Sequence, residues 1–167
     1  MKIDTGDFEN TQRLIDKLSD IAVAYDYSVA VVNADLLTTF LLLKKGRLSE
    51  AQKKAEQGII FSSRHSTELH QQFFFSWKAE AQIQLNDVDG AKESLLKAKK
   101  IIDQHKCLSP CIIKPYFIAQ FMMDIYLLRE AMVSNDRVIL SKLKKKAHYS
   151  GKNALNKLKK YALDRVK

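Results

Sequence analysis

Apolar residues recur along almost the whole chain at steps of three and four, which is the spacing of one face of an α-helix. Examples are Leu14, Ile15, Leu18, Ile21 and Ala22, and later Ala91, Leu95, Ala98, Ile101 and Ile102. No stretch alternates apolar and polar residues for long, as a half-buried strand would. The pattern predicts an all-α protein of about seven or eight helices, over 8–24, 28–45, 48–64, 67–85, 88–105, 115–133 and 137–165.

Turn residues separate these predicted helices. Lys44-Lys45-Gly46 is typical of a basic last turn followed by a C-terminal glycine, and Asn86 to Asp89 form a second short turn. Short loops of this kind join antiparallel helices. Pro110 and Pro115 predict an interruption that leaves Lys114 outside the next helix, and Gly151 predicts a break in the last one.

The two helix pairs repeat. Ala51 and Ala91 are 40 residues apart, and the same step relates Ala55 to Leu95 and Gly58 to Ala98, while Gly46 aligns approximately with Asp87. A helix hairpin repeated at this spacing predicts an α-solenoid, in which each unit buries its apolar face against its neighbours.

The turn segments Gly46-Arg47-Leu48-Ser49-Glu50-Ala51 and Asp87-Val88-Asp89-Gly90-Ala91 resemble the tetratricopeptide repeat (TPR), in a version with long helices. The chain departs from the family at Lys78, where leucine is usual, and at Gly58, where alanine is usual. The resemblance implies one right-handed, TPR-like solenoid domain over 1–167. Its clearest repeats are 30–65 and 70–105, followed by a less regular hairpin over 110–167.

Long-helix repeats of this type are similar to the repeat regions of large bacterial signalling ATPases and nucleotide cyclases. The resemblance therefore implies a noncatalytic interaction or scaffold module within a larger regulatory protein. An apolar stripe from Ala154 to Val166 has no following helix to cover it. We accordingly expect the natural chain to continue past Lys167, and uncovered faces of this kind also favour self-association.

The family usually binds ligands on the surface formed by the first helix of each pair. Carried over to this chain, the groove candidates are Asn33, Leu36, Phe40, Leu43 and Lys44 in the first repeat, and Phe73, Ser76, Glu80, Ile83 and Gln84 in the second. Leu36 and Phe40 stand where some members hold a peptide carboxylate with Asn and Lys. The expected partner is therefore an apolar protein or peptide segment, or another domain of the same polypeptide.

Composition places the chain among globular proteins, with 46% hydrophobic and 28% charged residues in 167 and no apolar run long enough to cross a membrane. The formal net charge of +9 comes from the predicted basic helix at 137–167, which has 11 Lys and Arg against one Asp. Its patch candidates are Lys142, Lys144, Lys145, Lys146, Lys152, Lys157, Lys159 and Lys160.

These lysines are consistent with binding to nucleic acid, an anionic membrane or an acidic partner, or with a solvated helix face. Only Tyr149 and Tyr161 lie among them, so a base-stacking platform is not indicated. Nucleic-acid or acidic-surface binding is kept as the alternative function. Changing Lys144, Lys145 and Lys146 to Glu is expected to leave folding intact.

Candidate chemistry is sparse. His105, Cys107 and Cys111 supply three ligands where a structural zinc site needs four, and His65 and His70 do not share one helix face. No phosphate loop or nucleophile motif occurs, so we expect no catalysis, cofactor or metal.

Two further expectations concern the aromatic residues and the location. Phe73, Phe74, Phe75 and Trp77 surround more than half a helix. Most are expected to pack in the core, some against the adjacent repeat, and one is a candidate to line a groove. Two cysteines and a polar N-terminus predict a cytoplasmic location.

Overall fold

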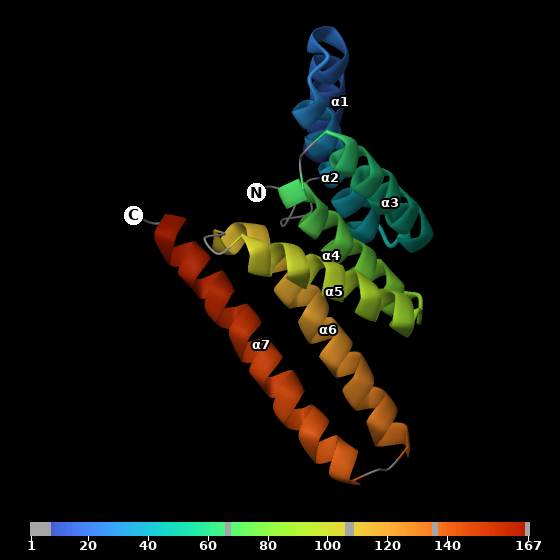
Figure 1. Cartoon of the computed structure of the whole chain (residues 1–167), viewed down its shortest axis with the longest axis vertical. Helices are drawn as coiled ribbons and strands as arrows, with labels where there is room; N and C mark the ends of the chain where they lie inside the picture. Colours follow the sequence, from blue (N-terminus) through green and yellow to red (C-terminus); the bar gives the residue numbers. More distant parts are fainter. Residues whose placement is uncertain (1–7, 66–67, 106–108, 135–136, 166–167) are drawn as a thin grey trace.

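The computed structural model describes residues 8–65, 68–105, 109–134 and 137–165, and within these ranges the chain forms seven α-helices and no strand (Figure 1). The helices are α1 (Phe8–Tyr25), α2 (Ser28–Lys44), α3 (Leu48–Arg64), α4 (Glu68–Gln84), α5 (Val88–Gln104), α6 (Pro110–Ser134) and α7 (Arg137–Arg165). The predicted all-α class is confirmed. Predicted and observed ends of the first five helices differ by one residue at most.

The hairpins α2–α3 and α4–α5 have the same bounds, shifted by 40 residues. Their turns also correspond, because Gly46 and Asn86 adopt positive φ angles of 71° and 63°. The predicted alignment of Gly46 with Asp87 was wrong by one residue. Asparagine is one of the few residues other than glycine that adopt this conformation readily, so Asn86 replaces the glycine of the first turn.

Asp87 has a different role, since its side chain caps α5. The Asp87 carboxylate accepts a hydrogen bond from the Gly90 amide at 3.0 Å and one from Gln82 Nε2 at 2.8 Å. Gln82 Oε1 in turn accepts from the Ser94 hydroxyl at 2.7 Å, so the buried glutamine joins α4 to α5. These bonds satisfy an otherwise free amide at the start of α5 and keep the buried polar groups paired.

Each helix packs against the next along the chain, and α4 also contacts α2 and α6. One core cluster joins Val32 and Leu36 of α2 to Ala55 of α3 and Phe74 of α4. A larger cluster joins α4, α5 and α6, and its buried members include Ala79, Ala98, Tyr116 and Met123. Small residues at the crossings allow the helix axes to lie close together.

Gly58 marks the closest crossing between the two repeated hairpins. The ring of Phe74 is fully buried and lies directly over Gly58, so that a Cβ atom at Gly58 would overlap the ring. The departure from alanine noted at Gly58 thus has a physical reason, which is the space that the Phe74 ring needs. Lys78, the other departure, pairs with Glu56 of α3 at 2.8 Å and joins the same two hairpins.

The last hairpin differs from the prediction at two prolines and a glycine. Helix α6 already begins at Pro110, so Lys114 and Pro115 lie inside it, and α7 continues through Gly151 without a break. Proline has no amide hydrogen, so Pro115 cannot donate to the carbonyl of residue 111. One turn before Pro115, Gln72 Nε2 of α4 donates to the Ile112 carbonyl at 2.5 Å and so joins α4 to the start of α6. At Gly151, a Cβ atom would lie 2.8 Å from the Phe121 ring, so this glycine serves a close helix crossing.

Helix α6 is also turned about its axis relative to α4. Ala79 of α4 and Ala119 of α6 are 40 residues apart, and both lie in the core cluster with α5. For α4 this neighbour is the next helix along the chain, whereas for α6 it is the preceding helix. Ala81 packs against Leu43 of the preceding hairpin, whereas Phe121 faces Gly151 of the following helix. The residues that face neighbouring helices thus differ between the α6–α7 pair and the α4–α5 pair.

Gly58→Ala is expected to lower the free energy of unfolding by about 1–3 kcal/mol, because the added methyl meets a rigid, buried ring. Helix propensity alone would make the alanine variant more stable by about 1 kcal/mol. A net loss of stability would therefore be due to the close contact with the Phe74 ring. Urea unfolding followed by circular dichroism measures the effect. Gln57→Ala, at the exposed neighbouring position, is the control. Gly58→Ala should also cost less in a Phe74→Leu background than in the parent protein, because the smaller side chain leaves room for the added methyl group. Equal or higher stability of Gly58→Ala would contradict this account.

Candidate functional site

A row of half-buried aromatic side chains crosses from α2 to α4. The rings of Phe40 and Trp77 have centroids 5.5 Å apart, and Trp77 lies 5.6 Å from Phe73, one turn away on α4. We call Phe40, Phe73 and Trp77 the aromatic seam. All three keep part of their surface in contact with solvent, so the seam offers apolar area and flat ring faces to a ligand.

Two oppositely charged side chains flank the seam. Lys44 Nζ lies 5.0 Å from the centroid of the Phe40 ring, within range of a cation–π interaction. Burial raises the pKa of the Glu80 carboxyl, and the positive charge of Lys44 offsets this rise in part. The seam is thus an apolar strip with one cation and one partly desolvated acid at its edge.

The structure divides the ten predicted groove residues into two groups. Asn33, Phe40, Phe73 and Glu80 are half-buried and Lys44 and Gln84 are exposed, whereas Leu36, Leu43, Ser76 and Ile83 are buried. Leu36 packs with Ala55, Leu43 packs with Ala51, and Ile83 lies in the cluster with Ala91. These four side chains build the hairpin cores, so a ligand would meet the other six.

Sequence reasoning placed Trp77 among core aromatics and left it out of the groove. The structure makes it the central ring of the seam, because it contacts Phe40 and Phe73 and also packs against the cluster of Leu43, Ala51 and Ala81. The spacing Phe73-x-x-x-Trp77, one helical turn, is the signal that could have joined Trp77 to the groove candidate Phe73. The expected burial holds fully for Phe74 alone, since Phe73, Phe75 and Trp77 are half-buried.

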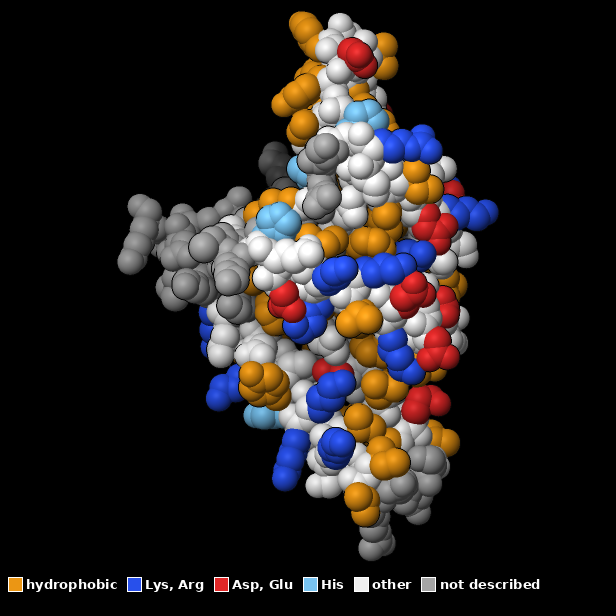
Figure 2. Space-filling model, viewed as in Figure 1, with side chains coloured by type: hydrophobic (Ala, Val, Ile, Leu, Met, Phe, Trp, Pro, Cys, Tyr) orange, Lys and Arg blue, Asp and Glu red, His pale blue; other side chains and the backbone are white. Residues whose placement is uncertain are grey.

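The basic patch lies along α7. Lys142, Lys144, Lys145, Lys152 and Lys159 are exposed, and the side chains of Lys157 and Lys160 lie outside the described part of the chain. Lys145, Lys152 and Lys159 are spaced by seven residues, which places them on one line along the outward side of the helix. Lysine side chains follow α7 in the lower part of Figure 2, while acidic side chains are concentrated on the right of that view.

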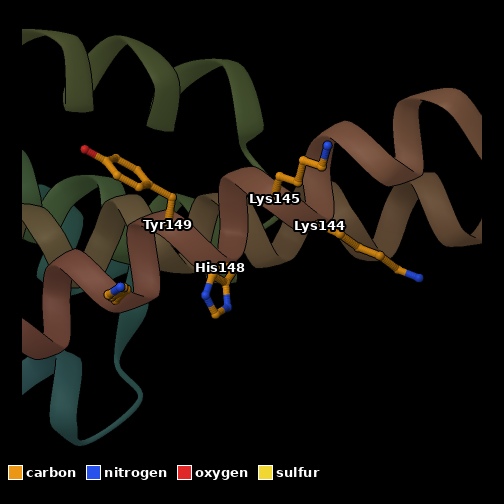
Figure 3. A pocket seen from close by; sticks show the side chains of 5 residues that line it. Lys144, Lys145, His148 and Tyr149 are labelled. Atoms are coloured by element: carbon orange, nitrogen blue, oxygen red, sulfur yellow. The ribbon is translucent and has the colours of Figure 1, made fainter.

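Close to Lys145, the side chains of α7 spread apart. Figure 3 shows Lys145 and Tyr149 on one side of the helix and Lys144 and His148 on the other, and these residues together with Lys152 border a shallow hollow. A hollow on a single convex helix encloses no ligand. This part of α7 is therefore suited to contact with an extended anionic surface and not to capture of a small molecule.

Lys146 differs from the other lysines of the patch. Its ammonium group lies 3.0 Å from Oδ1 of Asp124, a carboxylate that is only 1% exposed, and Gln120 donates to the same oxygen at 3.2 Å. A buried carboxylate is costly unless it is paired. Lys146 thus pairs with a buried carboxylate across the α6–α7 contact. Its replacement by Glu is therefore expected to affect stability, unlike replacement of Lys144 and Lys145.

The candidate metal and catalytic residues do not converge in the described part of the chain. The His65 ring stacks on Phe61, and His65 Nδ1 and His105 Nδ1 lie 2.9 Å from the carbonyl oxygens of Phe61 and Ile101. Cys107 and the side chains of Glu68 and Cys111 lie outside the described residues. Among the described ones, no group of three His, Cys, Asp or Glu side chains is placed to hold a metal ion.

Within the described ranges, none of the helices has the length and apolar character needed to cross a bilayer. Comparison of the chain with protein-family models, with curated proteins and with solved structures gave no match.

Lys146→Glu is expected to lower the free energy of unfolding by about 1–3 kcal/mol, because it places a second carboxylate beside the buried Asp124. Lys144→Glu and Lys145→Glu are the matched controls and should change stability by less than about 0.5 kcal/mol. Chemical unfolding of the three variants measures the difference. Equal stability of all three would show that the Lys146–Asp124 pair does not hold α7 on α6.

Glu80→Gln is expected to raise stability at neutral pH. A carboxyl whose pKa is raised on folding binds its proton more tightly in the folded state, so its ionisation destabilises the fold as the pH rises from the unfolded pKa through the folded one. Glutamine removes that effect, and the advantage should disappear in acid, below the ordinary glutamate range. Thermal unfolding across this pH range tests the prediction, with exposed Glu130→Gln as the control. A gain independent of pH would contradict it.

Proposed function

We propose that the chain is a noncatalytic protein-interaction module, a TPR-like right-handed α-solenoid, and that its α2–α4 surface binds a protein or peptide segment. In this proposal it works in the cytoplasm as part of a larger regulatory or signalling protein, and its ligand is another polypeptide or another domain of its own. The observation that carries the proposal is the contact between Phe40 and Trp77, because it forms one partly exposed aromatic strip from two successive hairpins.

The repeated register supports this reading. Phe40 and Glu80 are 40 residues apart, as are Lys44 and Gln84, and these positions lie on successive first helices that contact each other. A row of equivalent positions on adjacent first helices is how α-solenoids build extended binding surfaces. Large, partly exposed aromatic side chains supply much of the binding energy in protein interfaces.

The chemistry of the seam indicates the kind of segment that would fit. Phe40, Phe73 and Trp77 favour apolar or aromatic side chains, and the partial desolvation of Glu80 beside Lys44 favours a partner that brings a positively charged or hydrogen-bond-donating group to that carboxylate. An amphipathic helix with one basic residue next to its apolar stripe combines both features. We therefore expect such a helix as the ligand.

The test is selection of binding peptides from a displayed random library on the purified full chain. Trp77 is the only tryptophan, so its fluorescence reports binding at the seam directly. Selected peptides should be apolar with a basic residue, should change the Trp77 emission, and should bind Phe40→Ala at least tenfold more weakly than the parent protein.

Because Phe40→Ala also removes packing, Lys44→Gln is a second variant at an exposed position. It should alter affinity measurably without loss of stability, and Lys100→Gln, exposed on α5, should not. Failure to enrich any peptide, or binding that leaves the Trp77 emission and the Phe40→Ala affinity unchanged, would refute the proposed surface.

The alternative function, binding of nucleic acid or another acidic surface, is favoured by the line formed by Lys145, Lys152 and Lys159 on exposed α7. Binding to phosphates weakens steeply as salt rises, whereas binding at the seam should change little. Salt titration therefore separates the two functions.

A further inference from the structure

The α6–α7 hairpin ends in exposed apolar side chains. Met132 and Val133 at the end of α6 are 60% and 86% exposed, and Val138 and Ile139 at the start of α7 are 82% and 50% exposed. We call these four residues the hairpin tip. In Figure 1 the end of α6 and the start of α7 lie in the lowest part of the molecule, and Figure 2 shows hydrophobic side chains in that region.

The tip is exposed because the hairpin extends beyond the rest of the protein. The part of α6 that packs against α4 and α5 ends at Leu127. The last two turns of α6 and the first turns of α7 have each other as neighbours, which leaves their outer sides in solvent. Monomeric proteins seldom gather exposed apolar side chains at a projecting end without a binding role.

Positive charge begins directly behind the tip. Lys142, Lys144 and Lys145 are exposed and follow Val138 by four to seven residues, which corresponds to roughly 6–11 Å along the helix axis. Lysine side chains are long and flexible, so their ammonium groups can extend toward a surface that the tip contacts.

The exposed apolar residues of α1 lack this charge. Helix α1 exposes Val23 at 86%, as much as Val133, but its Arg13 and Lys17 are balanced by Asp16 and Asp20. The end of the α6–α7 hairpin thus combines exposed apolar residues with a cationic flank, whereas α1 does not.

We propose that the hairpin tip docks on an anionic membrane surface. Val133 and Val138 enter the boundary between headgroups and acyl chains, and Lys142, Lys144 and Lys145 neutralise lipid phosphates and carboxylates around them. Shallow insertion of apolar side chains and attraction to anionic lipid are each weak, and together they give reversible membrane binding. A nucleic acid would use the lysines but would leave the apolar tip in water, so a lipid surface accounts for both features. The proposal is independent of the α2–α4 seam.

Cosedimentation of the full chain with vesicles tests the proposal. The protein should bind vesicles of phosphatidylcholine with phosphatidylserine at least tenfold more tightly than vesicles of phosphatidylcholine alone, and less tightly as salt rises. The double variant Val133→Asp, Val138→Asp should lose binding at least tenfold, as should the triple change of Lys142, Lys144 and Lys145 to Glu. Val23→Asp, an equally exposed change on α1, should bind as the parent does, and circular dichroism should show that all variants are folded.

A second measurement reports insertion itself. Tryptophan placed by Val133→Trp should show blue-shifted emission with anionic vesicles and quenching by brominated lipid, relative to the unchanged signal of Trp77.

Three results would overturn the proposal. One is binding that persists in the double aspartate variant, which would mean electrostatic adsorption alone. Another is absence of vesicle binding together with salt-sensitive binding of RNA or DNA. The third is absence of vesicle binding together with self-association that the double variant abolishes, which would make the tip a contact between two copies.

Discussion

The packing of the Phe74 ring on the bare backbone of Gly58 fixes the spacing between the two repeated hairpins. A ring needs a flat surface to lie on, and only glycine gives a helix a surface without a projecting methyl group at that point. Once α3 and α4 meet there, the shared cluster of Val32, Leu36 and Ala55 closes around the same ring. The Lys78–Glu56 pair then lies across the same crossing.

The distance between the rings of the aromatic seam depends on this crossing. Phe40 and Trp77 belong to different hairpins, so their ring contact exists only where the hairpins stand at the spacing that Gly58 allows. The polar contacts at the start of α5 act within one hairpin instead, where Gln82 ties Ser94 to the Asp87 cap. Contacts within a hairpin therefore set its shape, and contacts between hairpins set the surface that a ligand meets.

Much of the fold was predictable because its signals are local. Helix periodicity, Gly46 and the short turn at Asn86 fixed five helices to within a residue, and the 40-residue step followed from Ala51 and Ala91. The predictions that failed concern residues whose environment is set by side chains far away in the sequence. Pro115 lies inside α6, and Gln72 of α4 donates to the nearby Ile112 carbonyl. Gly151 faces Phe121, and Lys146 pairs with an Asp124 whose burial no local pattern reveals. The family analogy likewise selected Leu36 and Ile83 for the groove, but only packing shows which side of a helix is covered.

Helix α6 connects the α6–α7 hairpin to the rest of the protein through direct packing. Helices α1 to α5 form one arm and the α6–α7 hairpin forms the other, and they meet through the packed cluster of Ala79, Tyr116, Ala119 and Met123 instead of a loose linker. Packed interiors transmit displacement because they have little free volume. A displacement of the α6–α7 hairpin would therefore have to disturb the packing of α4 and α5, because no loose linker is present in this cluster to absorb it.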